Sequence, residues 1–157
     1  MPKITTFLTY DDQAEEAAKF YVSIFENSRI RNVTRYGEAG PGLKGSAMTV
    51  TFELDGQEFV ALNGGPHFKF TDGISLSVEC KTQEEIDAYW DKLSEGGEQG
   101  PCGWLKDKFG LWWQINPTIL TEMFGDSDPE KSKRALQAML KMKKISIDGL
   151  KRAYEGR

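Results

Sequence analysis

The sequence predicts an α+β protein made of two related halves and a helical C-terminal segment. First, two distant segments share a pattern: Glu15-Glu16 recurs 69 positions later as Glu84-Glu85, and Phe20-Tyr21 recurs at the same offset as Tyr89-Trp90. Second, apolar and polar residues alternate ahead of each acidic pair, which is typical of a half-buried strand. Third, apolar residues then recur at helical spacing, so each half begins with a strand and a helix.

The first half continues with three more strands. Every second residue from Ile4 to Tyr10 occupies one face of the opening strand, and helical spacing predicts a helix from Ala14 to Phe25. Strand-like stretches follow at Arg29 to Tyr36 and at Met48 to Leu54. Asp55-Gly56 predicts a hairpin turn into a last strand. The first half therefore has the order βαβββ.

The second half repeats this order with shorter strands. Small polar residues alternate with apolar ones from Ile74 to Cys80, which predicts another half-buried strand. The segment Thr82-Gln83-Glu84-Glu85 has the pattern of a capping box, and Gly96-Gly97 ends the helix that it begins. Strand-like residues from Gln99 to Phe109 and a turn at Gly110 complete the second βαβββ unit.

After Pro117 the pattern becomes helical. We expect helices at Thr118 to Phe124, from an Asp128-Pro129 start to about Lys143, and at Ser146 to Tyr154. An apolar stripe predicts that this segment packs against the protein body or a partner subunit. The stripe consists of Leu136, Met139, Leu140 and Met142.

The length and composition are those of one folded domain. The chain has 157 residues, of which 39% are apolar and 28% charged, and this is enough to form a sizeable core. We expect one domain over 1–157, with a first module at about 3–63, a second at about 73–117 and a helical extension at about 118–155. The formal net charge is −4, which argues against a nucleic-acid partner.

Neither a membrane segment nor a disulfide framework is predicted. No stretch approaches the roughly 18 to 20 apolar residues of a membrane helix, and the N-terminal residues lack the apolar core of a signal peptide. We therefore expect a cytoplasmic protein with no membrane partner. Cys80 and Cys102 are too few for a disulfide framework and are most simply reduced thiols.

Four motifs carry a resemblance to a known family: Ala14-Glu15-Glu16-Ala17, Leu62-Asn63-Gly64-Gly65-Pro66-His67-Phe68, Cys102-Gly103-Trp104-Leu105-Lys106-Asp107 and Trp113-Gln114-Ile115. With the repeated βαβββ unit, they resemble the PhnB-like branch of the vicinal oxygen chelate superfamily, whose domain is labelled 3-demethylubiquinone-9 3-methyltransferase. Glyoxalase I, extradiol dioxygenases and bleomycin resistance proteins belong to the same superfamily. The resemblance implies two βαβββ modules whose curled mixed sheets enclose a cavity, commonly in a homodimer.

The methyltransferase chemistry in that label does not fit the residues. S-adenosylmethionine is usually held by a Gly-rich turn between a parallel strand and a helix. Asn63-Gly64-Gly65-Pro66 is the one candidate turn, and no helical pattern follows it. We therefore interpret the label as inherited nomenclature.

The resemblance also locates metal ligands in the metal-using members, on the first and last strands of each half. In this chain those positions fall near Thr6, Ser75 and Gln114 and between Val60 and Asn63. None of them is His, Cys, Asp or Glu, and neutral hydroxyls and amides are poor ligands for Zn, Fe or Ni. We expect no metal and no cofactor.

His67 and Cys102 are the two weak candidates for catalysis. His67 could act as a general base, or it could be a hinge residue that caps backbone groups after Gly64-Gly65-Pro66. Cys102 could be a reactive thiol, or a small residue buried in a strand.

Our interpretation is a metal-free domain that binds a small organic molecule in its cavity. Two alternatives stay open: a metal-independent lyase, isomerase or transferase that uses His67 or Cys102, and a structural or regulatory dimer whose cavity is filled by its own side chains. Pockets of this kind combine aromatic walls with a few polar anchors. The residues that we expect to line the cavity are Thr6, Phe52, Asn63, Ser75, Ser77, Trp104 and Gln114.

Overall fold

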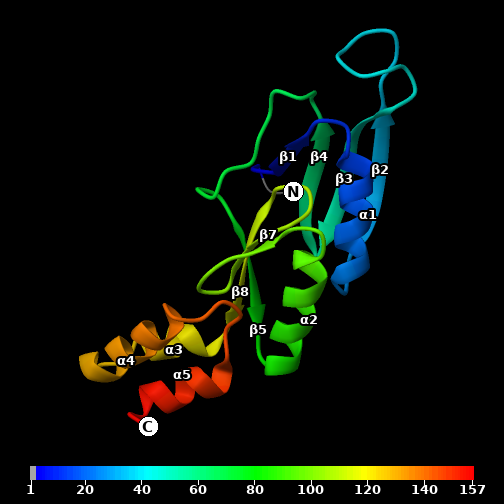
Figure 1. Ribbon diagram of the computed structural model, residues 1–157. Coiled ribbons are helices and arrows are strands. Elements are labelled where there is room, and N and C mark those ends of the chain that lie inside the picture. Colours follow the sequence, from blue (N-terminus) through cyan, green and yellow to red (C-terminus); the bar gives the residue numbers. More distant parts are fainter. Residues whose placement is uncertain (1–2) are drawn as a thin grey trace. The chain divides into compact units, whose positions relative to one another are not determined.

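The computed structural model describes residues 3–157 and divides the chain into two compact units, the first ending at Lys69 and the second running from Phe70 to Arg157. Each unit contains a four-stranded sheet and a helix packed on it (Figure 1). The elements of the first unit are β1 (Thr6–Tyr10), α1 (Ala14–Ile24), β2 (Arg29–Arg35), β3 (Ala47–Leu54) and β4 (Gln57–Asn63). Those of the second are β5 (Leu76–Cys80), α2 (Gln83–Ser94), β6 (Glu98–Gln99), β7 (Trp104–Lys106), β8 (Trp112–Pro117), α3 (Ile119–Phe124), α4 (Pro129–Met139) and α5 (Ile147–Tyr154).

The first sheet has the strand order β1-β4-β3-β2. β1 runs parallel to β4, whereas β4 with β3 and β3 with β2 are antiparallel pairs. Side chains alternate between buried and partly exposed along β3 and β4, because one face of the sheet packs on α1. The core of this unit lies between α1 and that face, and includes Leu8, Tyr10, Ala17, Tyr21, Val50, Phe52, Phe59 and Ala61.

The second sheet repeats the arrangement in the order β5-β8-β7-β6, again with one parallel pair, β5 with β8. The predicted fold class is therefore confirmed: a βαβββ module occurs twice, and each module forms a mixed sheet. Thr82 is the N-cap of α2, and its hydroxyl accepts a hydrogen bond from the backbone N–H of Glu85, as the capping pattern predicts. The core beneath α2 includes Cys80, Ile86, Trp90, Leu93, Leu105, Trp113 and Ile115.

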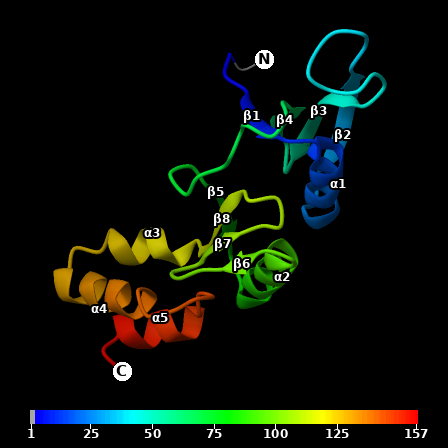
Figure 2. The ribbon, with the colours of Figure 1, turned by 45° about the horizontal axis from the view of Figure 1, so that its top comes forward.

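The C-terminal helices α3, α4 and α5 lie side by side in the second unit (Figures 1 and 2). They share a buried cluster of Leu120, Met123, Ala135, Ile145 and Leu150. Met139 and Met142 of the predicted apolar stripe pack on this cluster, whereas Leu136 and Leu140 are exposed. No helix in residues 3–157 is both long and apolar enough to span a membrane.

The helix that begins at Asp128-Pro129 ends earlier than predicted, at Met139 instead of about Lys143. The carbonyl groups of Met142 and Lys143 accept hydrogen bonds from the backbone N–H groups of Cys102 and Gly103, both at 2.8 Å. A continued helix would direct these carbonyls along its own axis. Contacts with the loop before β7 therefore accompany the end of the helix.

The two modules differ by one residue in the connection from first strand to helix. The helices keep the predicted offset, since the N-cap residues are Gln13 and Thr82. The strands do not, because Thr6 pairs with Phe59 whereas its equivalent Leu76 pairs with Trp113, an offset of 70. Because successive side chains of a strand point to opposite faces, a shift of one residue places Thr6 and Ser75 on opposite sides of their sheets.

Candidate functional site

One face of the second sheet combines polar and aromatic side chains. β8 alternates: Trp113 and Ile115 are buried in the core beneath α2, while Trp112, Gln114 and Asn116 point to the other side. The strand register places further residues on this side, since Ser77 and Trp104 both pair with Gln114, and Lys106 pairs with Trp112. We call this the polar face; it consists of Ser75, Ser77, Glu79, Glu98, Trp104, Lys106, Trp112, Gln114 and Asn116.

Hydrogen bonds between side chains link β8 to β5 and the residue before it. The Gln114 amide donates to the Ser75 hydroxyl at 2.9 Å, and the Asn116 amide donates to the Ser77 hydroxyl at 2.9 Å and to Gln114 Oε1 at 3.3 Å. The Ser77 hydroxyl in turn donates to Glu79 at 3.0 Å. This chain of amides and hydroxyls fixes the rotamers of Gln114 and Asn116, so the polar groups are held in place before any ligand arrives.

Aromatic side chains and one cation lie beside this chain of hydrogen bonds. The rings of Trp104 and Trp112 meet edge to face with their centroids 6.3 Å apart. Lys106 places its ammonium group 5.7 Å from the centre of the Trp112 ring and 3.5 Å from Glu98 Oε2. Across the strands, Lys106 lies beside Trp112, and Trp104 lies in one row with Gln114 and Ser77. These two adjacent rows together offer an apolar wall, neutral hydrogen-bond donors and acceptors, and a positive charge.

A buried carboxylate holds the hairpin that connects β7 to β8. Asp107 accepts hydrogen bonds from the backbone N–H groups of Phe109 and Leu111 through Oδ1, at 2.9 and 3.0 Å, and from the Trp113 indole through Oδ2, at 2.9 Å. Its side chain is nearly fully buried. Because Lys106 and Trp112 flank this turn, Asp107 fixes the spacing of two residues of the polar face.

The loop before β7 is braced by the C-terminal segment. Backbone hydrogen bonds join Cys102 and Gly103 to the carbonyls of Met142 and Lys143, and Ile145 packs against Gly103. A Cβ atom on Gly103 would lie 3.0 Å from Ile145 Cγ1 and 2.9 Å from the Ile115 carbonyl oxygen, at a φ of +82°. Glycine is therefore required here. Since Trp104 is the next residue, the C-terminal segment contributes to the position of this tryptophan.

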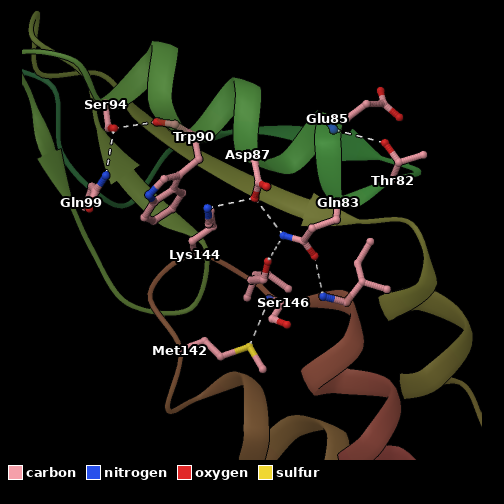
Figure 3. A network of polar contacts seen from close by, with 12 residues as sticks. Thr82, Gln83, Glu85, Asp87, Trp90, Ser94, Gln99, Met142, Lys144 and Ser146 are labelled. Carbon is pink, nitrogen blue, oxygen red and sulfur yellow. Dashed lines mark hydrogen bonds and ion pairs between the residues drawn. The ribbon is translucent and has the colours of Figure 1, made fainter.

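A second set of contacts joins the same segment to α2 (Figure 3). Gln83 accepts a hydrogen bond from the Ile147 backbone N–H at 2.8 Å and donates to the Ile145 carbonyl and to Asp87, both at 3.0 Å. Lys144 lies 2.9 Å from Asp87. The hydrogen bond from Gln83, followed by the one from Lys144, lowers the pKa of the Asp87 carboxyl below its ordinary value.

Of the seven residues predicted to line a cavity, four lie on the polar face: Ser75, Ser77, Trp104 and Gln114. The other three belong to the first unit and lie on the side that packs on α1. Phe52 is fully buried and stacks on Phe59, with ring centroids 5.5 Å apart. Thr6 pairs with Phe59 and shares that side of the sheet. The structure thus places Phe52 in the core of the first unit, in contrast to our expectation.

Asn63 binds the backbone and not an open surface. Its side chain accepts a hydrogen bond from the Ala14 N–H at 2.8 Å and donates to the Ala47 carbonyl at 3.0 Å. It therefore supplies the acceptor that the first turn of α1 needs, a role that Gln13 does not fill because its side chain makes no capping hydrogen bond. The side chain that we expect to anchor a ligand thus anchors the start of α1 in the structure.

The two weak catalytic candidates lie in different surroundings. His67 is exposed in a turn after β4, and no hydrogen bond to its ring is found among the described residues. Cys102 is half-buried and lies in the loop between β6 and β7, not in a strand as the packing alternative expects, with a left-handed φ of +59°. Cys80 is fully buried, and burial, reinforced by the carboxylates of Glu85 and Glu79, raises the pKa of its thiol to about 12.

The metal and cofactor sites implied by the superfamily do not fit the donor groups present. Within residues 3–157, no three His, Cys, Asp or Glu side chains come together in a way that could hold a metal ion. The amides and hydroxyls of the polar face are weak ligands for transition metals. The Gly64-Gly65-Pro66 segment leads through turns and coil to β5, and in these described residues no helix follows it.

Five residues of the polar face were not among those predicted from the sequence to line the cavity: Glu79, Glu98, Lys106, Trp112 and Asn116. Period-two alternation on the last strand contains the signal for two of them, because Trp112 and Asn116 flank Gln114 at a spacing of two. Lys106 is found the same way from Trp104. The side of the sheet that each strand presents becomes clear only when the register of all three strands is known.

Comparisons with known proteins agree with this architecture. A family model described as 3-demethylubiquinone-9 3-methyltransferase matches residues 2–116, so α3 to α5 lie outside the matched range. The solved structure of a PhnB protein from Bacillus cereus, described by the same methyltransferase name, is 41% identical; the match covers 74% of this chain and 100% of that one, with a TM-score of 0.67.

Two more distant structures share the fold alone. A protein from Pseudomonas aeruginosa is 18% identical over 74% of this chain and 98% of its own, with a TM-score of 0.63. The fosfomycin resistance protein FosX from Listeria monocytogenes is 16% identical over 78% of this chain and 97% of its own, with a TM-score of 0.53. No curated protein matches the chain.

Proposed function

Because this chain belongs to the PhnB-like family described as 3-demethylubiquinone-9 3-methyltransferase, within the vicinal oxygen chelate superfamily, we propose that it binds a small organic molecule on the polar face of the second sheet, without a metal ion. The observation that carries the proposal is the chain of hydrogen bonds from Ser75 through Gln114 and Asn116 to Ser77, beside the Trp104–Trp112 pair. Small-molecule sites typically combine such aromatic walls with a few fixed polar groups.

The surrounding contacts support a binding site more than a methyltransferase site. The polar groups of the face are held by neighbouring side chains, and the hairpin and the loop on either side of β7 are each anchored, by Asp107 and by the C-terminal segment. Such anchoring reduces the ordering entropy that a ligand would otherwise have to offset. The Gly-rich segment after β4 lacks the helix N-terminus that would receive the carboxylate or ribose of S-adenosylmethionine.

Ligand discovery by native mass spectrometry and thermal shift tests the proposal. The panel contains divalent metals, quinones, aromatic acids and antibiotics, and a bound ligand raises the melting temperature by mass action. We expect a metal-independent shift with one organic class. The variant Gln114→Leu should reduce the shift, whereas the matched control Gln137→Leu, on the exposed side of α4, should retain it.

Two results would contradict the proposal. One is a shift that requires a divalent metal together with stoichiometric metal in the native mass. The other is a ligand shift that Gln114→Leu and Gln137→Leu leave equally intact, because the ligand would then bind away from the polar face. Any ligand that passes the test is then assayed for turnover, which separates a binding protein from a metal-independent lyase, isomerase or transferase.

We also propose that the chain forms a homodimer. Large apolar side chains are exposed on and beside the edge strands of both sheets, among them Phe7 of β1 and Ile74 just before β5. Exposed apolar groups of this kind often mark an interface. Light scattering coupled to gel filtration should give twice the chain mass, and a monomer at all concentrations tested would contradict the dimer.

A further inference from the structure

We propose that the ligand is a planar aromatic carboxylate, with its ring against Trp104 and Trp112 and its carboxylate at Lys106. This inference rests on the binding function proposed above and adds the chemical class of the ligand. Three properties of the polar face carry it: the geometry of the two indoles, the position of the cation, and the donor left by Ser75.

The aromatic pair favours a flat ring. Trp104 and Trp112 are both half-buried and meet at an interplanar angle of 64°. The two indole planes meet at a corner. A planar ring can stack on one indole while its edge contacts the other. An aliphatic chain would bury apolar area there without this aromatic geometry, so the pair discriminates in favour of aromatic ligands.

The charge next to the pair favours an acid. Lys106 is the one cation among the residues of the polar face that the structure describes, and its ammonium group lies near the Trp112 ring. Its partner Glu98 is 71% exposed, and an ion pair in this setting is weak. A ligand carboxylate can therefore compete for Lys106. Glu79, on the opposite edge strand, would repel the same carboxylate and so fixes the orientation of the ligand.

The Ser75 hydroxyl can donate a hydrogen bond to the side of the ligand ring away from Lys106. The Ser77 hydroxyl donates to Glu79 and accepts from Asn116, so both of its functions are used. The Ser75 hydroxyl accepts from Gln114, and no described group accepts its proton. Lys106, Trp112 and Ser75 lie in one row across β7, β8 and the residue before β5. Neighbouring strands are about 4.8 Å apart, so Lys106 and Ser75 are about 10 Å apart, the length of a fused two-ring acid. A ring substituent that accepts a hydrogen bond, such as a hydroxyl or carbonyl oxygen, would reach Ser75.

Titration calorimetry with matched probes tests the inference. The probes are benzoate, naphthoate, the methyl ester of naphthoate and naphthylmethylamine, which keep an aromatic ring and differ in size or charge. We expect naphthoate to bind most tightly and its ester at least about fivefold more weakly, since the ester lacks the charge that Lys106 binds. Lys106→Met should abolish this difference, while the control Lys108→Met, in the exposed hairpin, should preserve it.

Two further variants separate the contribution of the aromatic ring to binding from that of the Lys106 charge. Trp104→Leu should weaken acid and ester alike, because it removes the aromatic wall and leaves Lys106 in place. Glu98→Gln should strengthen binding of the acid by about two- to fivefold, because it frees Lys106 from its partner. Far-UV circular dichroism and the melting temperature of each variant establish that it is folded.

The outcomes distinguish this inference from the proposed function. If the ester or the amine binds as tightly as naphthoate, or if Lys106→Met keeps the preference for the acid, the ligand class is wrong. If a ligand of another class in the discovery panel binds in a manner that depends on Gln114, the binding function stands and the aromatic acid is rejected. If no ligand depends on Gln114, both the function and the inference fail.

Discussion

Asp107 is a buried carboxylate that accepts hydrogen bonds from three N–H groups, two in the backbone of its own hairpin and one in the Trp113 indole. We predict that Asp107→Ala lowers the free energy of unfolding by about 3 kcal/mol or more, because it leaves buried donors without an acceptor, at about 1–3 kcal/mol each. Asp107→Asn should lower the free energy of unfolding less, because the amide oxygen can still accept hydrogen bonds from the backbone N–H groups of the turn. Urea unfolding measures both, and equal stability of parent and alanine variant would contradict the assignment.

Cys80 gives the chain a predictable alkaline sensitivity. Its thiol has a pKa of about 12 in the folded protein, against an ordinary value of 9.0. Between these values the unfolded chain loses the proton and the folded chain keeps it, so the unfolded state binds fewer protons and the free energy of unfolding falls as pH rises from about 9 towards 12.

The variant Cys80→Ala isolates this effect from other groups that titrate at alkaline pH. We expect its free energy of unfolding to fall less steeply than that of the parent over the same pH range, in urea titrations at successive pH values. Cys102→Ala, at the half-buried cysteine, is the matched control and should follow the parent. Parallel curves for parent and Cys80→Ala would show that the buried thiol does not carry the dependence.

At the scale of elements, the C-terminal segment is attached to α2 through Gln83 and to the loop before β7 through Cys102 and Gly103. Gln83→Ala removes the acceptor of the Ile147 N–H and the donor to the Ile145 carbonyl. We predict a loss of about 1–2 kcal/mol in the free energy of unfolding and faster hydrogen exchange at the Ile147 amide. Glu84→Ala, at the exposed neighbouring position on α2, should change stability by less than about 0.5 kcal/mol.

Faster hydrogen exchange confined to the region of Ile147 would show that Gln83 holds α5 locally and does not simply stabilise the whole unit. If Gln83→Ala leaves exchange at Ile147 as slow as in the parent, the hydrogen bonds of Gln83 do not hold α5. If exchange instead rises uniformly over the second unit, Gln83 acts on the whole unit and not on the junction. Trp104 fluorescence should also respond, because the braced loop leads directly into β7.

The presence of each helix and strand could be predicted from the sequence. The side of the sheet on which each strand residue lies could be predicted only in part. The alternation around Ser75 and Ser77 identifies the correct side of β5, and the capping pattern at Thr82 identifies the start of α2. A gapless repeat makes Ser75 the equivalent of Thr6, but the extra residue between β1 and α1 puts these two residues on opposite sides of their sheets. The end of α4 depends on contacts with Cys102 and Gly103, which lie far away in the sequence.

At the scale of the whole molecule, the two modules share a fold but not the chemistry of their faces. The register makes Phe7, Val60 and Leu62 the equivalents of Ser77, Gln114 and Asn116. The first sheet is thus apolar at three positions where the second is polar, so the two modules share a fold but not the polar face. Sequence similarity between modules predicts the common architecture, and the individual side chains decide which module can anchor a polar ligand.

Tertiary contacts determine the surroundings of Phe52 and Asn63, which the sequence led us to expect at the cavity. Phe52 lies on a strand, and its side follows from the pairing of β3 with β4, which local sequence does not specify. Asn63 looks like a ligand anchor until its amide is found bound to the backbone of Ala14 and Ala47. Polar residues at strand ends serve helix starts as readily as ligands, and tertiary contacts decide between the two.

The most direct measurement of the central claim is the map of amide chemical-shift changes in isotope-labelled protein during titration with naphthoate. We predict that the largest changes fall on the strands of the polar face, at Ser75 to Glu79, Trp104 to Lys106 and Trp112 to Asn116. They should saturate with one affinity and be lost in Gln114→Leu. Changes confined to the first unit, or changes that survive in Gln114→Leu, would contradict a ligand site on the second sheet.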